Sequence, residues 1–361
     1  MRAKRNLANS AGMREYVPRS GLGTLIRPSV AKRLNTATSV LCKALALLAF
    51  ASFPVMAPAT QGAANALAAG DAIRAGRTAL FDMTPYNGGF LAVGERGVVM
   101  RSKDDGRTWS GVMAPTTRTL VSIVVLDPET LLAVGHGGSI VRSADGGQTW
   151  SAVDATDAGS DSILGVTLLS SGQLVAYGSY GLFLVSDDKG ATWERRSVIS
   201  EDFDRHISKI VESEGSLYLV GESGTLARSD DGGEHWMQLD SPYKGSFFGL
   251  VSLGKDDVVV FGMRGNVFRT RDGGASWTQI PFESKSALNG GYRAPDGRVV
   301  ITGNNGLVAV SDPAVGSFTL QFVPEGMPVA KAMYAEDGSL VYVGYLATGR
   351  LAPSGARAVQ Q

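Results

Sequence analysis

Short apolar segments alternate with polar, glycine-containing turns from residue 76 to residue 354. Residues 119–125, TLVSIVV, are one such apolar segment. Each unit has the same order of elements: strand, turn, strand, glycine turn, strand, Asp-containing turn, strand. Four short antiparallel strands in every unit of about 40 residues are the pattern of a β-propeller blade.

A glycine motif of the form apolar-Gly-x-x-Gly-apolar occurs once in every unit. Its copies start at Gly94, Gly135, Gly178, Gly221, Gly262, Gly303 and Gly344, the last of them without the second glycine. Neighbouring copies are 41–43 residues apart, so the number of units is seven. Thirteen residues before four of these glycines stands a small residue, as expected where inner strands crowd around an axis: Ser122, Gly165, Gly249 and Gly290.

A second motif, Ser/Thr-x-Asp-x-Gly-x-polar-Trp, follows five of the glycine turns. Its aspartates and tryptophans are Asp104 and Trp109, Asp145 and Trp150, Asp188 and Trp193, Asp231 and Trp236, and Asp272 and Trp277. A sixth copy has Pro313 and Phe318 in these two positions and is predicted to have lost its Asp. The carboxylate can accept backbone N–H bonds across the turn, the glycine permits positive φ, and the Trp packs over the blade. We therefore interpret the motif as structural.

Two carboxylate pairs, Asp187-Asp188 and Asp230-Asp231, raise the alternative of calcium ligation. The spacing and the closing Glu of an EF-hand loop are absent from the sequence. The chain has three histidines and one cysteine, Cys42. We therefore expect no metal ion and no cofactor, and neither disulfides nor zinc–thiolate sites.

These repeats predict an all-β fold, a seven-bladed β-propeller of four-stranded antiparallel blades over residues 76–361. The last unit has three evident strands, so a fourth strand has to come from elsewhere, or the ring stays open at an exposed edge. Residues 60–75 are predicted to be a linker or a ring-closing strand. The alternative is a last blade of three strands.

The zero net charge of the 361-residue chain hides an asymmetry. Residues 1–59 carry nine Lys or Arg and one acid, a net of +8, which leaves a net of −8 for the rest. The segment ends in an apolar run, residues 44–59, and in Ala57-Pro-Ala59, so residues 1–59 are predicted to be a basic leader and signal peptide. An uncleaved anchor is the alternative. The acidic body argues against nucleic acid as a partner.

The second motif resembles the Asp-box, or BNR repeat, of sialidases and related propellers. With its Gly94-Glu-Arg-Gly97 turn, seven repeats and leader, the chain most resembles the photosystem II stability/assembly factor family, over residues 76–354. The family includes members of non-photosynthetic bacteria, often associated with RND-type exporters. The resemblance implies a non-enzymatic scaffold in the thylakoid lumen or the periplasm. Such a scaffold binds a membrane-protein complex and assists its assembly, and we expect no small-molecule substrate.

The resemblance also implies a basic patch for the partner, and the side chains inside the glycine turns differ in every unit. We expect glycine turns and inter-blade connections to open on one face of the ring. The predicted partner-binding residues are Arg96, His136, Tyr180, Glu222, Arg264, Asn305, Tyr345, Arg118, Arg205 and Lys331. Lys331 stands on the last inner strand. Unrelated surface arginines are the alternative interpretation.

The competing class of function is a glycoside hydrolase of the sialidase type. Such an enzyme needs an arginine cluster, a Tyr nucleophile with a Glu partner and an acid/base carboxyl group. Isolated candidates are Tyr180, Tyr345, Glu95, Glu222 and Asp82. The six blades and the Arg-Ile-Pro-like entry motif of these enzymes are absent from the sequence, so a binding scaffold is favoured.

Overall fold

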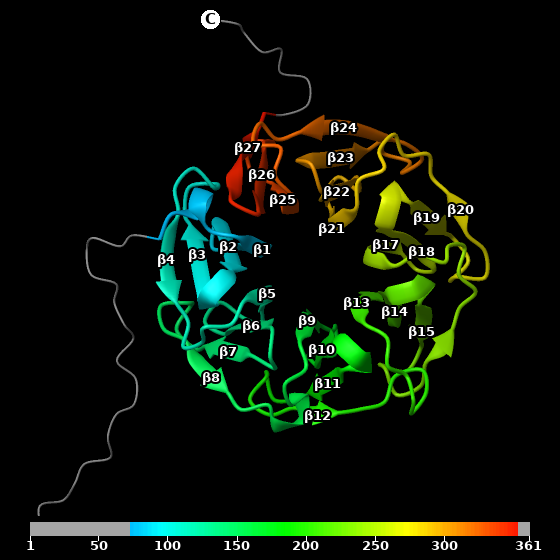
Figure 1. The fold of residues 1–361 in the computed structure, drawn as a ribbon, viewed down its shortest axis with the longest axis horizontal. Coiled ribbons are helices and arrows are strands. Elements are labelled where there is room, and N and C mark those ends of the chain that lie inside the picture. Colours follow the sequence, from blue (N-terminus) through cyan, green and yellow to red (C-terminus); the bar gives the residue numbers. More distant parts are fainter. Residues whose placement is uncertain (1–72, 353–361) are drawn as a thin grey trace, which may run out of the picture. The chain divides into compact units, whose positions relative to one another are not determined.

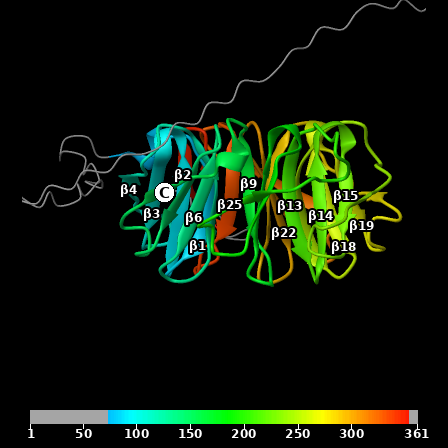
Figure 2. The same ribbon diagram turned by 90° about the horizontal axis from the view of Figure 1, so that it is seen from below.

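Seven small antiparallel sheets stand around a central opening in the computed structural model, which describes residues 73–352 (Figure 1). The first strand of each sheet lies beside the opening and the last lies at the rim. In side view the strands run between two faces of the ring (Figure 2). The predicted seven-bladed β-propeller is confirmed.

The first three blades each have four strands in sequence order. Their strands are β1 (Leu80–Tyr86), β2 (Gly89–Gly94), β3 (Val98–Ser102) and β4 (Ser110–Met113); β5 (Leu120–Val125), β6 (Leu131–Gly135), β7 (Ile140–Ser143) and β8 (Ser151–Val153); and β9 (Ile163–Leu168), β10 (Leu174–Gly178), β11 (Phe183–Ser186) and β12 (Glu194–Arg195).

The remaining four blades follow the same order. Their strands are β13 (Ile207–Ser213), β14 (Ser216–Gly221), β15 (Leu226–Ser229) and β16 (Met237–Gln238); β17 (Phe247–Gly254), β18 (Asp257–Gly262), β19 (Val267–Thr270) and β20 (Thr278–Gln279); β21 (Leu288–Arg293), β22 (Val299–Gly303), β23 (Leu307–Ser311) and β24 (Phe318–Phe322); and β25 (Val329–Tyr334), β26 (Leu340–Gly344) and β27 (Ala347–Leu351).

Short 3-10 helices complete the described chain: η1 (Ala75–Arg77), η2 (Glu95–Gly97), η3 (Thr156–Ala158), η4 (Ser179–Gly181), η5 (Glu222–Gly224) and η6 (Met263–Gly265). Four of them, η2, η4, η5 and η6, are glycine turns. No helix within residues 73–352 has the length and apolar character needed to cross a membrane.

The core is divided into clusters that each lie between neighbouring blades. Met83 of blade 1 and Val343 of blade 7 share one cluster, which closes the ring. Each box Trp packs on the cluster shared with the preceding blade, for example Trp193 with Leu132 of blade 2. Burial of apolar faces between blades is therefore the main force that holds the ring together.

The last blade has three strands within the described residues. The 3-10 turn η1 contacts β27, and Ile73 packs on the cluster between blades 7 and 1. Residues 73–79 form no strand. The rest of the predicted linker or ring-closing strand, residues 60–72, and the predicted signal peptide, residues 1–59, lie outside the described residues.

Candidate functional site

The loops of each blade divide between the two faces of the ring. The glycine turns join the second and third strands and lie on the same face as the inter-blade connections. For example, His136 N–H donates to Thr119 O, and Gly138 N–H donates to Asp161 O. The boxes lie on the other face with the turns between first and second strands, as the bond from Gly146 N–H to Glu129 O shows. We call these the Gly-turn face and the Asp-box face.

The first glycine of each turn is required by a close approach of two backbones. In all seven blades the N–H of the next residue donates to the carbonyl just before the inner strand, as from Glu95 to Ala79 (3.0 Å) or from Tyr345 to Pro328 (2.9 Å). A Cβ on Gly94 or Gly344 would lie 2.2 Å from that carbonyl oxygen. The constant glycine therefore anchors a turn whose other side chains are free to vary.

The third residue of each turn has a left-handed backbone. Arg96 (φ 54°), Tyr180 (φ 54°), Arg264 (φ 57°) and Asn305 (φ 58°) occupy this position. In the other blades it is Gly137, Ser223 and Leu346. The predicted residues His136, Glu222 and Tyr345 are the second residues of their turns, so sequence reasoning mixed two positions and missed Ser223 and Leu346. An offset of two from the first glycine would have found both.

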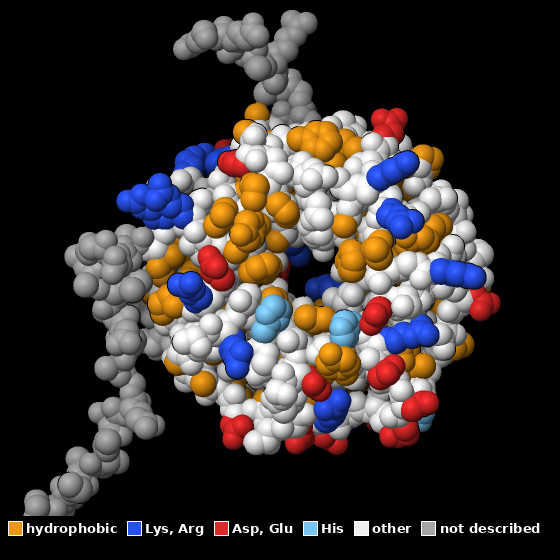
Figure 3. Space-filling view, in the orientation of Figure 1, with side chains coloured by type: hydrophobic (Ala, Val, Ile, Leu, Met, Phe, Trp, Pro, Cys, Tyr) orange, Lys and Arg blue, Asp and Glu red, His pale blue; other side chains and the backbone are white. Residues whose placement is uncertain are grey.

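Nine of the ten predicted partner-binding residues are exposed on the Gly-turn face: Arg96, Arg118, His136, Tyr180, Arg205, Glu222, Arg264, Asn305 and Tyr345. Figure 3 shows this face, where basic, histidine and apolar side chains surround the central opening. Lys331 is placed differently. Its ammonium lies 3.7 Å from Asp82 Oδ1, and its side chain is 19% exposed, so it lines the channel between blades 7 and 1.

Blades 3 and 4 share a small polar cluster on the Gly-turn face. The N–H of Tyr180 donates to Nδ1 of His206 (3.2 Å), and the two rings meet edge to face. The N–H of His206 donates in turn to Glu222 Oε2 (3.3 Å). Tyr180 as a residue is 62% exposed. The cluster therefore fixes the backbone of this turn and leaves the aromatic ring available for contact.

Basic side chains differ in whether they have a carboxylate partner, and both kinds occur on each face: Arg195 pairs with Asp161 (3.5 Å) near a glycine turn, and Arg271 of the Asp-box face has no carboxylate within 4.0 Å among residues 73–352. On the Asp-box side, Arg107, Arg228, Arg269, Arg298 and Arg350 form ion pairs. On the Gly-turn face, Arg96, Arg118, Arg205 and Arg264 have no carboxylate within 4.0 Å among residues 73–352. Large apolar side chains are also exposed in these turns: Tyr180, Met263, Tyr345 and Leu346. The face thus offers unpaired charge next to apolar surface.

Box aspartates are fully engaged with their own turns. Asp188 Oδ1 accepts from Ser186 Oγ (2.9 Å) and from the N–H of Thr192 (2.9 Å), and its Oδ2 accepts from Thr192 Oγ1 (2.6 Å). Gly190 N–H donates to Ser186 Oγ (2.9 Å). The carboxyl groups of four boxes have pKa values lowered to about 2: Asp104, Asp188, Asp231 and Asp272. The chief cause in each box is hydrogen bonding from the residue four positions after the aspartate.

The sixth box keeps a bridging carboxylate, which corrects the expectation that its Asp is lost. Asp312, one position earlier than in the other boxes, accepts from Gly316 N–H (3.1 Å) and from Ser317 Oγ (2.7 Å). Val315 takes the place of the box glycine at φ 53°. Its side chain is buried in the cluster between blades 5 and 6, beside Phe318 in the Trp position. In the sixth box, an aspartate shifted by one position therefore forms the hydrogen bonds of the turn, and a buried valine takes the place of the glycine.

The carboxylates considered for calcium have protein donors. Asp187 accepts from Gln173 Nε2 (2.9 Å), and Asp230 accepts from Arg228 Nε (2.7 Å) and Ser216 Oγ (2.6 Å). Their neighbours Asp188 and Asp231 are bound within the boxes. These carboxylates therefore work as hydrogen-bond acceptors of the turns.

The candidate residues for a glycosidase do not meet at one site, although Tyr180 and Glu222 lie close together through His206. Glu95 accepts a bond from Ala79 N–H (3.1 Å), and Tyr345 is exposed in the last blade. Asp82 lies in the channel and accepts bonds from the N–H of Met83 (2.9 Å) and of Ile123 (3.1 Å). Its carboxylate thus joins blade 1 to blade 2.

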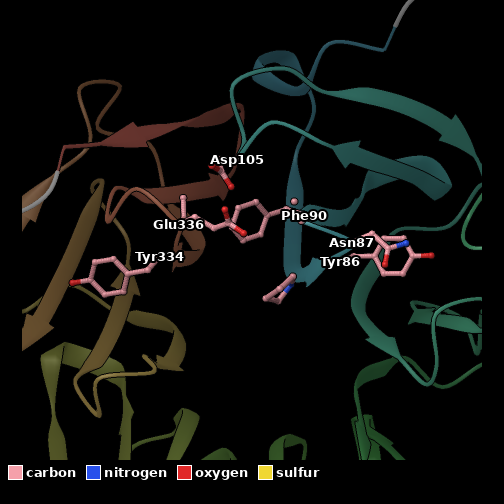
Figure 4. A pocket seen from close by; sticks show the side chains of 10 residues that line it. Tyr86, Asn87, Phe90, Asp105, Tyr334 and Glu336 are labelled. Carbon is pink, nitrogen blue, oxygen red and sulfur yellow. The ribbon is translucent and has the colours of Figure 1, made fainter.

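Two hollows lie on the opposite, Asp-box face, on either side of the turn that begins at Tyr334. One, of about 320 Å³, lies between blades 7 and 1, where Asp105 and Glu336 approach Phe90 (Figure 4). The other, of about 380 Å³, lies between blades 6 and 7 and is lined by Asp296 and Arg298. None of the ten predicted partner-binding residues lines either hollow.

Comparison with known proteins supports the resemblance expected from the sequence. The family model described as photosynthesis system II assembly factor YCF48 matches residues 169–325, which span β10 to β24. No curated protein matches the chain.

Similar solved structures share the propeller fold at low identity. They include "YCF48 bound to D1 peptide", with 16% identity, a TM-score of 0.61, and coverage of 76% of this chain and 91% of that chain. YCF48 from Cyanidioschyzon merolae has 15% identity, a TM-score of 0.60, and coverage of 78% and 97%. A streptogramin B lyase has 10% identity, a TM-score of 0.65, and coverage of 77% and 95%. At such identities these structures show the fold alone. The match of the family model to residues 169–325 confirms the resemblance of this chain to the photosystem II assembly factor family.

Proposed function

We propose that this propeller is an exported, non-enzymatic scaffold that binds a segment of a membrane-protein complex on its Gly-turn face and assists assembly or stability of that complex. The observation that carries the proposal is the set of unpaired arginines on this face, Arg96, Arg118, Arg205 and Arg264, beside exposed aromatic rings. Arg and Tyr are residue types enriched at the centres of protein interfaces. A guanidinium without an internal partner can form charge-assisted bonds to a partner's carboxylates.

The family match supports a role like that of photosystem II assembly factors, and the solved YCF48 structure with a D1 peptide supports a protein segment as ligand. In a photosynthetic host the compartment would be the thylakoid lumen and the partner a photosystem II component. In another bacterium the compartment would be the periplasm and the partner an RND-type exporter. The proposed export rests on the basic, apolar segment of residues 1–59.

Charge reversal tests the proposal. The double variant Arg96→Glu with Arg264→Glu should lose capture of the membrane complex that the wild-type chain isolates from solubilised host membranes. The matched control, Lys103→Glu with Arg271→Glu, makes the same charge change at exposed residues of the Asp-box face and should retain capture. Equal capture by both double variants would contradict the assignment of the face. Hydrolysis of a glycoside that stops in Asp82→Asn would contradict the scaffold.

A further inference from the structure

The inner strands share a β-bulge near the Gly-turn face. In every blade the pairing of the first and second strands shifts register after the first residue, as between Leu80 and Asp82 in blade 1. One residue per blade is therefore extra in the ladder, and it lies where the inner strand begins, at the mouth of the central channel. In blades 4 and 6 this residue is Ser208 or Asn289. In the other five blades it is apolar, and we call these five residues the apolar collar: Phe81, Val121, Leu164, Phe248 and Ala330.

The bulged residues point towards the start of the next inner strand. In blade 6 the side chain of Asn289 shows this direction, because its Nδ2 donates to the carbonyl of Val329 in blade 7 (3.2 Å). The same register gives the apolar collar the same place in the other blades. Phe81 is 40% exposed, and the other four collar residues are half-buried. Figure 3 shows apolar side chains at the edge of the central opening. Water therefore reaches an interrupted ring of apolar side chains in the middle of the Gly-turn face, and exposed apolar surface of this kind is typical of an interaction site.

Two charged side chains lie directly below the apolar collar. Asp82 and Lys331 follow the bulged residues of blades 1 and 7, and the Lys331 ammonium lies 3.7 Å from Asp82 Oδ1. Asp82 also accepts bonds from the N–H of Met83 (2.9 Å) and of Ile123 (3.1 Å). An apolar group at this depth would take the two charges out of water, which is costly. The channel mouth therefore suits one apolar side chain at the level of the collar and disfavours a deeper apolar insertion.

The apolar collar has basic neighbours where blades 1 and 2 meet. Arg118 lies three residues before the collar residue of blade 2, in the connection between the two blades. Ala114 N–H at the start of this connection donates to Gly97 O (2.8 Å) in the glycine turn that carries Arg96. Neither arginine has a carboxylate within 4.0 Å among residues 73–352. Glu95 of the same turn already accepts a backbone N–H bond. An apolar centre with a polar rim is the composition of a protein interface, and these two rim residues favour a ligand with carboxylate groups.

We propose that the channel mouth on the Gly-turn face is an anchor site, and that it takes one apolar or aromatic side chain of a protein segment whose neighbouring residues are acidic. Burial of the anchor against the apolar collar supplies the driving force for binding. The acidic neighbours of the anchor bind Arg96 and Arg118, which fixes the direction of the segment. This inference rests on the proposed function and adds the chemical character of the bound segment, which the arginines alone do not define.

Calorimetric titration of the purified full chain with two synthetic peptides tests the anchor site. One probe is an acidic nonapeptide with a single central phenylalanine, and the other has alanine in that position. The wild type should bind the phenylalanine peptide at least about tenfold more tightly, because the ring is buried against the collar. The double variant Phe81→Ser with Phe248→Ser should reduce this preference to less than about threefold. The control Met237→Ser with Phe322→Ser removes exposed apolar side chains from the outer strands β16 and β24 and should keep the preference of the wild type.

Two further variants separate loss of the apolar collar from loss of the fold. Phe81→Leu with Phe248→Leu keeps the collar apolar and should keep most of the preference for the phenylalanine peptide. Phe81→Ser alone, at the most exposed collar residue, should lower the preference less than the double serine variant, and melting curves show that each variant is folded. Equal binding of the two peptides by the wild type, no binding of either, or an unchanged preference in both serine variants would overturn the anchor site. The proposed function fails instead if Arg96→Glu with Arg264→Glu retains capture of the membrane complex.

Discussion

Arg269 and Arg264 belong to the same blade but serve opposite faces of the ring. Arg269 is 10% exposed, and its guanidinium forms a bidentate pair with Asp257, with both distances 2.7 Å. It also donates to the carbonyl of Ala314 in the next blade (2.6 Å). Arg264 is exposed in a glycine turn and has no carboxylate within 4.0 Å in the part of the chain that the structure describes. In this blade one arginine connects strands and neighbouring blades through hydrogen bonds, and the other has donors available for a partner.

The contrast extends to the repeated motifs. The Asp-box face repeats its side chains because each of them forms bonds within the turn. The Gly-turn face repeats its glycines because the backbone approaches a carbonyl there, and its other side chains vary. Constancy of side chains thus marks the face that stabilises the fold, and variation on a constant backbone marks the face suited to recognition.

The largest expected effect is loss of a box tryptophan. Trp193 is 9% exposed and packs between blades 2 and 3. Trp193→Ala should lower the free energy of unfolding by about 3–5 kcal/mol, as for other buried aromatic side chains. Tyr180→Ala on the Gly-turn face, at 62% exposure, should change it by no more than about 0.5 kcal/mol. Denaturant unfolding of both variants measures the difference, and similar losses would contradict the division between the faces.

The two arginines of blade 5 give the next largest difference. Arg269→Met removes the bidentate pair, leaves Asp257 without its partner, and should cost about 2–3 kcal/mol of unfolding free energy. Arg264→Met should cost less than about 0.5 kcal/mol. Chemical denaturation of the two variants measures both values. Equal stability of the two would show that Arg269 is as free as Arg264.

The dependence of the unfolding free energy on pH reports on the carboxylates of the Asp-box face. Their pKa values are lowered in the folded chain, to about 2 for Asp188, from the ordinary aspartate value of 3.8. The unfolded state therefore binds protons first, and the stability from these groups is complete above about pH 4 and is lost as pH falls towards about 2. The free energy of unfolding should fall over this window, less steeply in Asp188→Asn. An unchanged slope would mean that Asp188 is not held by its turn.

The fold could be predicted because its signals are local. Seven glycine turns and five boxes at constant spacing follow from bonds within a single blade, so the sequence displays them directly. The placement of Lys331 could not be predicted in this way. Its neighbour Asp82 lies in the first blade and becomes adjacent only when the ring closes. Likewise, some arginine partners come from a neighbouring blade, as Asp256 does for Arg228, and no repeat period encodes such a contact.

Val315 shows how a box accommodates a residue other than glycine at its left-handed position. Variants at this position give the smallest expected difference in unfolding free energy. It occupies the glycine position of the sixth box with a left-handed backbone, which costs a residue with a Cβ about 1–2 kcal/mol. Its buried side chain offsets this cost by packing between blades 5 and 6. Val315→Ala loses most of that packing and keeps the strain, whereas Val315→Gly loses the packing and relieves the strain. We therefore expect Val315→Gly to be more stable than Val315→Ala by about 0.5–1 kcal/mol, after allowance for the greater freedom of glycine in the unfolded chain. Thermal unfolding of both variants measures the order. The usual order, with alanine more stable than glycine, would mean that this turn does not need the left-handed conformation that the other boxes give to glycine.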